Sequence, residues 1–333
     1  MLLCWFLLAQ TSDLVETRRI ALLPQDAEIG HIVIGRAGRT FAYVASKDNR
    51  SRAVIGDWIS EPYPIAVGFV FSHDLKSCIW LSVDENGWNS IANKGTVLWR
   101  YKARSGWGGT WPVAVSGDGS TVAQKWHDET RKRWTIAVNG EPGREHAEPV
   151  GVPVISRDGW TVAYQATLNG NFLVVHGDLE GPAYDIVGNP VVTPDGRTVV
   201  YSADKEDQTF VHANDKRWPV RFPVRTVFAS EDGAKVGYIA HRKSGEKRTW
   251  SITRLPDAEE LPEYLGIDGA CLSPDGALAF IARGLDGEDV VVVGEKRYPA
   301  EGVIRGPEFY DGGKKIGYGA RLGNELWWKV IPR

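Results

Sequence analysis

The chain has 333 residues, of which 43% are hydrophobic and 24% are charged, and its formal net charge is −3 with a pI near 6.2. This near-neutral balance, with no block or stripe of basic residues, lacks the electrostatic footprint of a nucleic-acid-binding protein, so no nucleic-acid partner is expected. The length does not require two domains, because all-β architectures of this size often form one.

The first twelve residues read as an apolar leader. Leu2–Ala9 is apolar throughout, as in the core of a signal peptide, but no Lys or Arg precedes it and no small-residue cleavage site follows it. The segment is too short to cross a membrane as a helix, so no integral membrane span is expected. We assign residues 1–12 to a leader or possible signal segment and 13–333 to one domain. A cytoplasmic location is favoured, with a periplasmic or exported one as the alternative if the leader is a signal peptide.

A four-residue turn recurs along the rest of the chain. Its full form is Ser/Thr-x-Asp-Gly, and five complete copies are accompanied by three degenerate ones. The spacings between successive anchor residues are 37, 44, 40, 37, 37, 43 and 37 residues. A fixed period in this range is the signature of a repeat architecture. The anchors are Gly38, Leu75, Gly119, Gly159, Gly196, Gly233, Gly276 and Gly313.

Each turn is predicted to join two antiparallel strands. Segments such as Thr161–Ala166 and Thr198–Ala203 follow their anchors and are short, β-branched and aromatic, which is typical of strands. Glycine adopts positive φ without steric cost, and the aspartate can accept hydrogen bonds from backbone amides ahead of it. A second hairpin follows in most repeats, for example at Asn139-Gly140. Each repeat is therefore predicted to be a four-stranded meander, and such repeats favour a radial arrangement.

The eight anchors predict an all-β propeller of eight blades, with seven as the alternative. The last repeat supplies only three strand-like segments before the chain ends, within Pro307–Phe309, Lys315–Tyr318 and Glu325–Ile331. Leu14–Leu23 precedes the first repeat. We predict that this N-terminal segment completes the last blade, because pairing the two terminal edges removes an aggregation-prone edge.

The Ser/Thr-Pro-Asp-Gly turn followed by an apolar strand is similar to the WD40-like repeat of TolB-type β-propellers. Val175–Val187, leading into Thr193–Gly196, resembles in particular a bacterial propeller-repeat family of unassigned function. The resemblance covers about residues 30 to 333 and implies the fold rather than an activity. The Trp-Asp pair of true WD40 repeats is absent from the sequence, and Gly-His, present once at Gly30-His31, does not recur with the repeat. An α/β domain like the one that precedes the TolB propeller is absent as well.

The sequence carries no recognised catalytic or cofactor motif. Gly-x-Ser-x-Gly, His-Glu-x-x-His, Cys-x-x-Cys, the P-loop and the dinucleotide fingerprint do not occur. The three cysteines (Cys4, Cys78 and Cys271) are an odd number, and the two in predicted strands are interpreted as buried thiols. We therefore assign no catalytic residue, no metal site and no cofactor, and we expect a monomer.

The predicted binding surface is the face opposite the Asp-Gly turns. The loops on that face vary in length and charge, as in Asp204–Gln208 and Gly284–Asp289, whereas the turns are short and uniform. The longest insertion is rich in the residue types that dominate binding hot spots. Its aromatic side chains either form a recognition patch or wedge between blades. The candidate binding residues are Trp88, Trp99, Arg100, Tyr101, Arg104, Trp107 and Trp111.

These features favour a non-enzymatic binding scaffold that engages a protein or peptide partner through the variable-loop face. The alternative is an enzyme that acts on a carbohydrate or peptide in the central channel. An enzyme needs converging polar groups in a closed pocket. The segments that open the first strands are mostly apolar, which predicts a packed and inert bore; examples are Val113–Val115, Pro153–Ile155, Pro190–Val192 and Ala270–Leu272.

Overall fold

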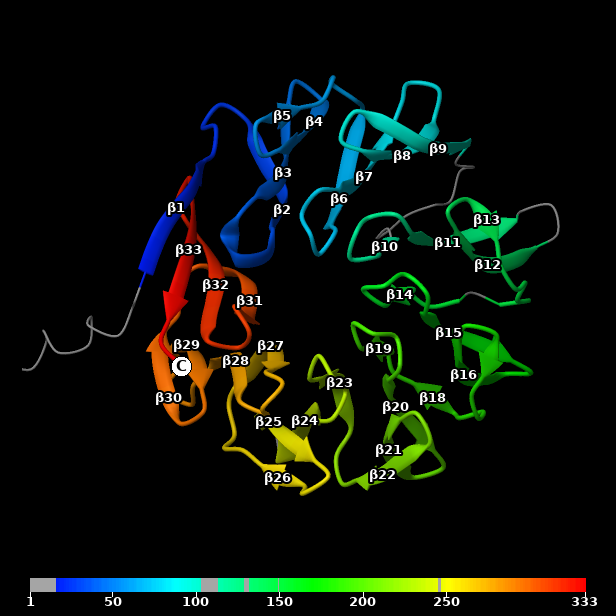
Figure 1. The fold of residues 1–333 in the computed structure, drawn as a ribbon, viewed down its shortest axis with the longest axis vertical. Coiled ribbons are helices and arrows are strands. Elements are labelled where there is room, and N and C mark those ends of the chain that lie inside the picture. The colour runs from blue at the N-terminus through cyan, green and yellow to red at the C-terminus, as the bar shows by residue number, and fades with distance from the viewer. Residues whose placement is uncertain (1–15, 103–112, 129–131, 149, 245–246) are drawn as a thin grey trace, which may run out of the picture.

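The computed structural model describes residues 16–102, 113–128, 132–148, 150–244 and 247–333. These residues form eight antiparallel sheets arranged as a closed ring around a central axis (Figure 1). The eight-bladed β-propeller is thus confirmed, and the seven-bladed alternative is wrong. The described residues contain almost no helix, apart from the single 3-10 turn η1 (Arg36–Gly38). Within them, no helix has the length and apolar character needed to cross a membrane.

Each blade is a meander whose strands follow one another in sequence from the channel outward. The first four blades are β2 (Glu28–Ile34), β3 (Phe41–Lys47), β4 (Arg50–Ile55) and β5 (Trp58–Ile59); β6 (Ile65–Phe71), β7 (Cys78–Val83), β8 (Trp88–Asn93) and β9 (Thr96–Lys102); β10 (Val113–Val115), β11 (Val122–Asp128), β12 (Arg133–Val138) and β13 (Glu141–Pro142); and β14 (Val154–Ile155), β15 (Val162–Leu168), β16 (Asn171–His176) and β17 (Leu179–Glu180).

The other four blades repeat this plan with two variations. They are β18 (Ile186–Val187), β19 (Val191–Val192), β20 (Val199–Lys205), β21 (Gln208–Ala213) and β22 (Lys216–Val220); β23 (Val224–Ala229), β24 (Val236–Ser244), β25 (Lys247–Leu255) and β26 (Glu259–Glu260); β27 (Gly266–Leu272), β28 (Leu278–Arg283), β29 (Asp289–Val293) and β30 (Lys296–Pro299); and β31 (Val303–Tyr310), β32 (Lys315–Leu322) and β33 (Glu325–Ile331) with β1 (Glu16–Leu22).

The first variation lies in the fifth blade, where β18 and β19 both pair with β20 and so form one interrupted inner strand. The second closes the ring. β1 pairs antiparallel with β33 as the outer strand of the eighth blade, and Arg19 forms a 2.7 Å ion pair with Glu325 across that pairing. The prediction that the N-terminal segment completes the last blade is confirmed, so the terminal edges are paired with each other.

The repeated turn is held by its own side chains. In the fifth blade, Thr193 Oγ1 donates to Asp195 Oδ1 at 2.7 Å and accepts the backbone N–H of Thr198 at 3.0 Å. The N–H of Gly196 donates to the carbonyl oxygen of Thr193 at 2.9 Å, and Gly196 has φ +71°. The hydrogen bond from Thr193 holds the pKa of Asp195 below its ordinary value, so this carboxylate stays ionised as an acceptor. The turn is therefore a structural device, as predicted.

The core lies between the blades. The aromatic residue five positions after the anchor is buried in six blades, at Tyr43, Trp80, Tyr164, Tyr201, Tyr238 and Tyr318. Each packs with aliphatic side chains of its own and the adjoining blade. Burial of this apolar surface between successive sheets is what fixes the ring. Cys78 and Cys271 are free thiols within β7 and β27, and burial raises the pKa of each to about 12.

Candidate functional site

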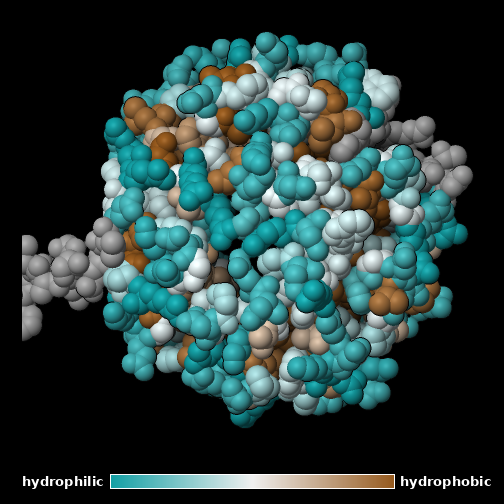
Figure 2. Space-filling view, in the orientation of Figure 1, coloured by the Kyte–Doolittle hydropathy of each residue, from teal (hydrophilic) through white to brown (hydrophobic). Residues whose placement is uncertain are grey.

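A cavity of about 590 Å³ occupies the centre of the ring. In the space-filling view the molecule is hollowed at this point, and the surface around the hollow is mainly hydrophilic (Figure 2). Its deeper walls are apolar, as expected from the first strands, and include Phe71, Val115, Ile155, Val192 and Leu272. The predicted packed bore is wrong, however, because the inner strands of eight blades stand too far apart for these small side chains to fill the axis.

The second residue of the repeated turn lines the mouth of this cavity. The inner strand of each blade ends at the turn, so the residue after the Ser or Thr is carried to the channel rim. Seven successive turns contribute this residue to the cavity lining: Arg36, His73, Gly117, Arg157, Pro194, Glu231 and Pro274. The turns are uniform in backbone, as predicted, but this one position varies freely. The rim of the turn face is therefore chemically diverse.

Backbone hydrogen bonds between neighbouring turns make part of the rim rigid. The N–H of Asp74 donates to the carbonyl oxygen of Gly117 at 2.9 Å, and the N–H of Gly117 donates to that of Arg157 at 2.6 Å. The N–H of Arg157 donates in turn to the carbonyl oxygen of Pro194 at 2.9 Å. Three consecutive blade junctions are thus linked at the channel. Side chains on these linked turns are therefore held on a fixed backbone, as a preorganised binding site requires.

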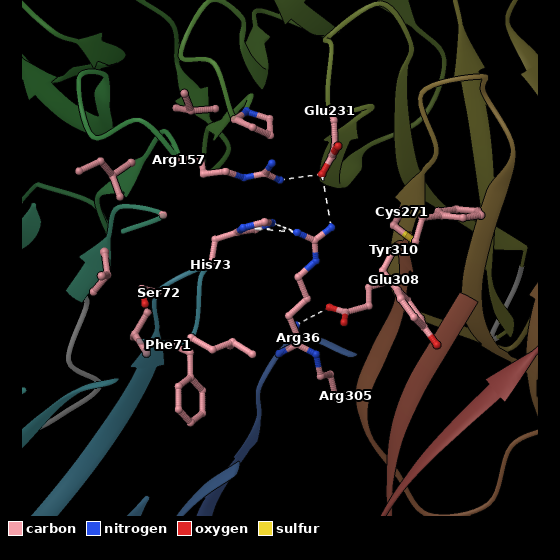
Figure 3. Close-up of a pocket in the computed structure, with 18 of the residues that line it drawn as sticks. Arg36, Phe71, Ser72, His73, Arg157, Glu231, Cys271, Arg305, Glu308 and Tyr310 are labelled. Atoms are coloured by element: carbon pink, nitrogen blue, oxygen red, sulfur yellow. Dashed lines mark hydrogen bonds and ion pairs between the residues drawn. The ribbon is translucent and has the colours of Figure 1, made fainter. Parts of the chain in front are cut away.

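Four charged or polar side chains meet across the mouth (Figure 3). Arg157 of the fourth blade donates from Nη2 to Glu231 Oε1 of the sixth blade at 2.6 Å. Arg36 of the first blade extends toward the same oxygen, with Nη2 at 3.9 Å, and its Nη1 hydrogen-bonds the His73 imidazole of the second blade. We call Arg36, His73, Arg157 and Glu231 the mouth cluster. It joins residues that are up to 195 positions apart in the sequence (231 − 36 = 195).

The mouth cluster carries a net positive charge at neutral pH. Burial, together with the charges of Arg157 and Arg36, lowers the pKa of His73 to about 4, so its ring is neutral. Burial alone would raise the pKa of Glu231, but the hydrogen bond and charge of Arg157 and the charge of Arg36 outweigh it and keep the pKa below its ordinary value. Two guanidinium cations therefore face one carboxylate.

Glu231 is held loosely in this cluster. Its side chain is 49% exposed, and those of Arg36 and Arg157 are 29% and 36% exposed. Ion pairs with this much solvent contact contribute only ~0–1 kcal/mol. Glu231 can therefore move away from the arginines at small cost.

A second charged pair, Arg305 and Glu308 of β31, borders the same cavity and connects the eighth blade to the first. Arg305 Nη2 donates to Glu308 Oε2 at 2.6 Å. Arg305 also donates to the carbonyl oxygen of Ile34, and Glu308 accepts the N–H of Ala37. Since these donors and acceptors bind each other and the neighbouring backbone, the pair stabilises the closure of the ring and is less free to meet a ligand.

The arrangement at the mouth suits the recognition of negative charge. A guanidinium presents five N–H donors, and the two arginines of the cluster share one carboxylate oxygen and one imidazole between them. Among the described residues, no group of three or more His, Cys, Asp and Glu side chains is placed to hold a metal ion. The mouth therefore presents a pair of cations above a cavity whose deeper walls are apolar.

Of the binding residues predicted from the sequence, the structure brings two together. The Arg100 guanidinium lies 5.5 Å from the ring centroid of Trp88 and donates to Asp84 Oδ2 at 2.5 Å. Both side chains are partly exposed, on β8 and β9 at the edge of the second blade. Trp99 and Tyr101 lie on β9, and their side chains are outside the described part of the chain, as are Arg104, Trp107 and Trp111 altogether.

The face opposite the turns carries several exposed aliphatic side chains. Antiparallel order places the start of each inner strand and the links between blades on that face. Exposed residues at these points occur in five blades: Ile65, Val152, Ile186, Leu265 and Ile304. We call these five residues the inner rim; they lie near the start of the inner strands, at the opposite end of those strands from the turns.

No protein-family model matches the sequence, and no curated protein matches it. Among solved structures, the dihydro-heme d1 dehydrogenase NirN in complex with DHE is similar over 96% of this chain and 78% of that chain, with a TM-score of 0.51 and 14% identity. The hydrazine synthase of Kuenenia stuttgartiensis is similar over 80% of this chain and 94% of that chain, with a TM-score of 0.44 and 13% identity. At this low sequence identity, the similarity to NirN is evidence for the fold alone.

Proposed function

We propose that the protein is a non-enzymatic β-propeller that binds its partner in the channel mouth on the turn face. The observation that carries this proposal is the mouth cluster, in which Arg36 and Arg157 converge above an apolar cavity of about 590 Å³. That volume falls within the range of small-molecule sites, which spans ~300–1,000 Å³. A small molecule or the end of a peptide fits such a cavity, whereas a folded domain can only cover it.

Binding accounts for the polar groups at the mouth better than catalysis does. General acid–base chemistry needs groups whose pKa lies near the working pH. Glu231 has a lowered pKa, His73 one of about 4, and Cys271, which also lines the cavity, one of about 12. The Ser72 hydroxyl donates to Asp74 within its turn at 2.7 Å. These states favour fixed charge recognition over proton transfer at neutral pH.

The enzyme alternative is an activity on a carbohydrate or peptide in the same channel. NirN is described as a dehydrogenase, which shows that a propeller of related shape belongs to an enzyme in that case. Turnover of a channel ligand by the wild-type protein, seen as a new product by mass spectrometry, would support this alternative.

A second candidate function is the docking of a protein partner on the variable-loop face. The exposed inner rim of that face, which includes Ile65, Ile186 and Leu265, favours it, because several large apolar side chains exposed on one face are typical of interaction surfaces.

One purification experiment separates these proposals. Three tagged proteins are purified from the native host: the wild type, Val192→Trp, which fills the cavity that Val192 lines, and the double variant Ile186→Asp, Leu265→Asp on the opposite face. Mass spectrometry then identifies small molecules, peptides and proteins retained by each. The channel proposal expects a species that is lost only with Val192→Trp. A species lost only with the double variant would contradict it and support docking on the variable-loop face.

A further inference from the structure

We propose that the channel mouth recognises a carboxylate group, which takes the place of Glu231 between Arg36 and Arg157, while an apolar body attached to that carboxylate fills the channel below. This inference rests on the proposed function and names the chemical class of its ligand. The mouth cluster, the cavity walls and the position of Glu231 each contribute to it.

The two arginines have N–H donors that Glu231 does not engage. Among the described residues, the Arg157 side chain makes one hydrogen bond, to Glu231 Oε1. The nearest nitrogen of Arg36 lies 3.9 Å from that same oxygen, which is beyond hydrogen-bond distance. A guanidinium binds a carboxylate best through two parallel N–H···O bonds. Neither arginine binds Glu231 in this way, so a ligand carboxylate placed between them would gain contacts that Glu231 does not make.

The position of Glu231 indicates where a ligand carboxylate would bind. It projects into the mouth from the turn of the sixth blade and meets arginines from the first and fourth blades (Figure 3). Because its side chain is about half exposed, it can turn toward solvent when a ligand enters. Once Glu231 has moved, two cations and a neutral imidazole remain at the mouth. One or two negative charges would be accommodated there, and the existing geometry is that of a carboxylate.

The walls below the mouth select for an apolar body. The inner strands run toward the turn, so the residues just before it lie deeper in the channel: Phe71, Val115, Ile155, Val192 and Leu272 all line the cavity there. Against these five side chains, a sugar or nucleoside would leave hydroxyl or base groups without partners, which is unfavourable. An aliphatic chain or an apolar side chain would bury its surface there at no such cost.

Two sources can supply this chemistry: a free aliphatic acid, and the C-terminus of a peptide whose last residues are apolar. Two matched pairs of probes distinguish them. Octanoate and 1-octanol share a chain and differ in the carboxylate. Acetyl-Leu-Leu-Leu as the free acid and as the amide differ only in the charge of the C-terminus.

The test is isothermal titration calorimetry of each probe into the full-length protein and five variants, one of which is the cavity-filling Val192→Trp described above. Arg157→Ala and Arg36→Ala each remove one cation, and Glu231→Gln removes the charge of the internal competitor. Arg197→Ala is the matched control, since Arg197 lies in the next turn, is 86% exposed and is not part of the cavity lining. Thermal unfolding of each variant verifies that it is folded, and either arginine variant suffices if the other fails to fold.

We expect the acid of at least one pair to bind at least about tenfold more tightly than its neutral partner, and the arginine variants to lose about tenfold in affinity. Glu231→Gln should bind the acid more tightly than wild type does, and Arg197→Ala should bind it equally well. Preference for octanoate identifies a free acid as the ligand class, and preference for the peptide acid identifies a C-terminus.

Two results would overturn the carboxylate assignment. If the acid and its neutral partner bind equally, and Val192→Trp abolishes both, the channel is a ligand site without charge selection, and the proposed function survives. If neither acid binds at ~1 mM, the carboxylate assignment is wrong. The purification with Val192→Trp then decides separately whether the channel holds any ligand.

Discussion

Gly196 provides a direct test of how the repeated turn packs between blades. This residue has φ +71°, a conformation that costs a non-glycine residue ~1–2 kcal/mol. A Cβ atom added here would lie 2.5 Å from Thr161 Oγ1 and 3.1 Å from Thr161 Cβ of the preceding blade. The Thr161 hydroxyl also donates to the Gly196 carbonyl oxygen at 3.1 Å, so it cannot move away freely.

The two effects give a magnitude for Gly196→Ala. Relieving the contact with Thr161 should cost a further ~1–3 kcal/mol, as other overpacked sites do. The sum is a loss of ~2–5 kcal/mol in the free energy of unfolding, and Gly196→Val should lose at least as much. Gly170 is the matched control, because it has φ +78° with open space around its Cβ position. Gly170→Ala should therefore lower the free energy of unfolding only by the ~1–2 kcal/mol that positive φ costs a non-glycine residue.

Urea unfolding followed by both fluorescence and circular dichroism measures the two variants against wild type. If the m-value is unchanged, the difference in midpoint reports the difference in stability. We expect Gly196→Ala to be less stable than Gly170→Ala by ~1–3 kcal/mol. Equal losses would refute the close approach of the turn to Thr161, and an unchanged Gly196→Ala would refute the turn itself.

Three further predictions concern pH, the mouth and the closure of the ring. Burial and then the charge of Arg217 lower the pKa of His212 from 6.5 to about 4. Between pH 6.5 and 4 only the unfolded chain takes up the proton, so the free energy of unfolding should fall by up to ~3 kcal/mol over this range. Urea unfolding of His212→Gln should show a smaller fall over the same range. In Gly117→Ala the new Cβ would lie 2.2 Å from Arg157 Cγ, so the variant should bind octanoate more weakly in calorimetry, whereas Gly140→Ala, with open space at its Cβ, should not. Deleting residues 1–22 removes β1 and exposes the edge of β33, so size-exclusion chromatography should show larger species or aggregates than for wild type. An unchanged elution volume with unchanged melting would contradict the closure.

The fold could be predicted from the sequence because its determinants are local. The Ser/Thr hydroxyl, the aspartate and the glycine of each complete turn interact within six residues, as Thr193 and Asp195 do with the backbone of Thr198. A pattern that short recurs visibly along the chain, and counting it gave the number of blades. The last repeat has three strand-like segments in the sequence, and the strand that completes its blade is β1, which pairs with β33.

The mouth cluster could not be predicted in the same way. Its members occupy the variable position of an otherwise uniform turn, and nothing in the sequence distinguishes this position from an ordinary loop residue. Only the closed ring brings Arg36, Arg157 and Glu231 to one point. The apolar lining was visible in the inner strands, but the space between them depends on how eight blades close, which no local pattern encodes.

The contact between Trp88 and Arg100, two of the predicted binding residues, has local determinants, unlike the mouth cluster. Trp88 and Arg100 belong to neighbouring strands of one hairpin, so their contact follows from local register. Whether the remaining predicted residues, such as Trp107 and Trp111, join them remains a prediction, since they lie outside the described residues.

Hydrogen–deuterium exchange with and without octanoate tests most directly whether the channel mouth is the binding site. We expect slower exchange in the turns that line the mouth, at residues 33–38, 69–76, 153–159 and 229–233, with no change at 204–208 and 284–289 on the opposite face. Protection confined to the variable loops, with exchange at the mouth unaltered, would contradict it.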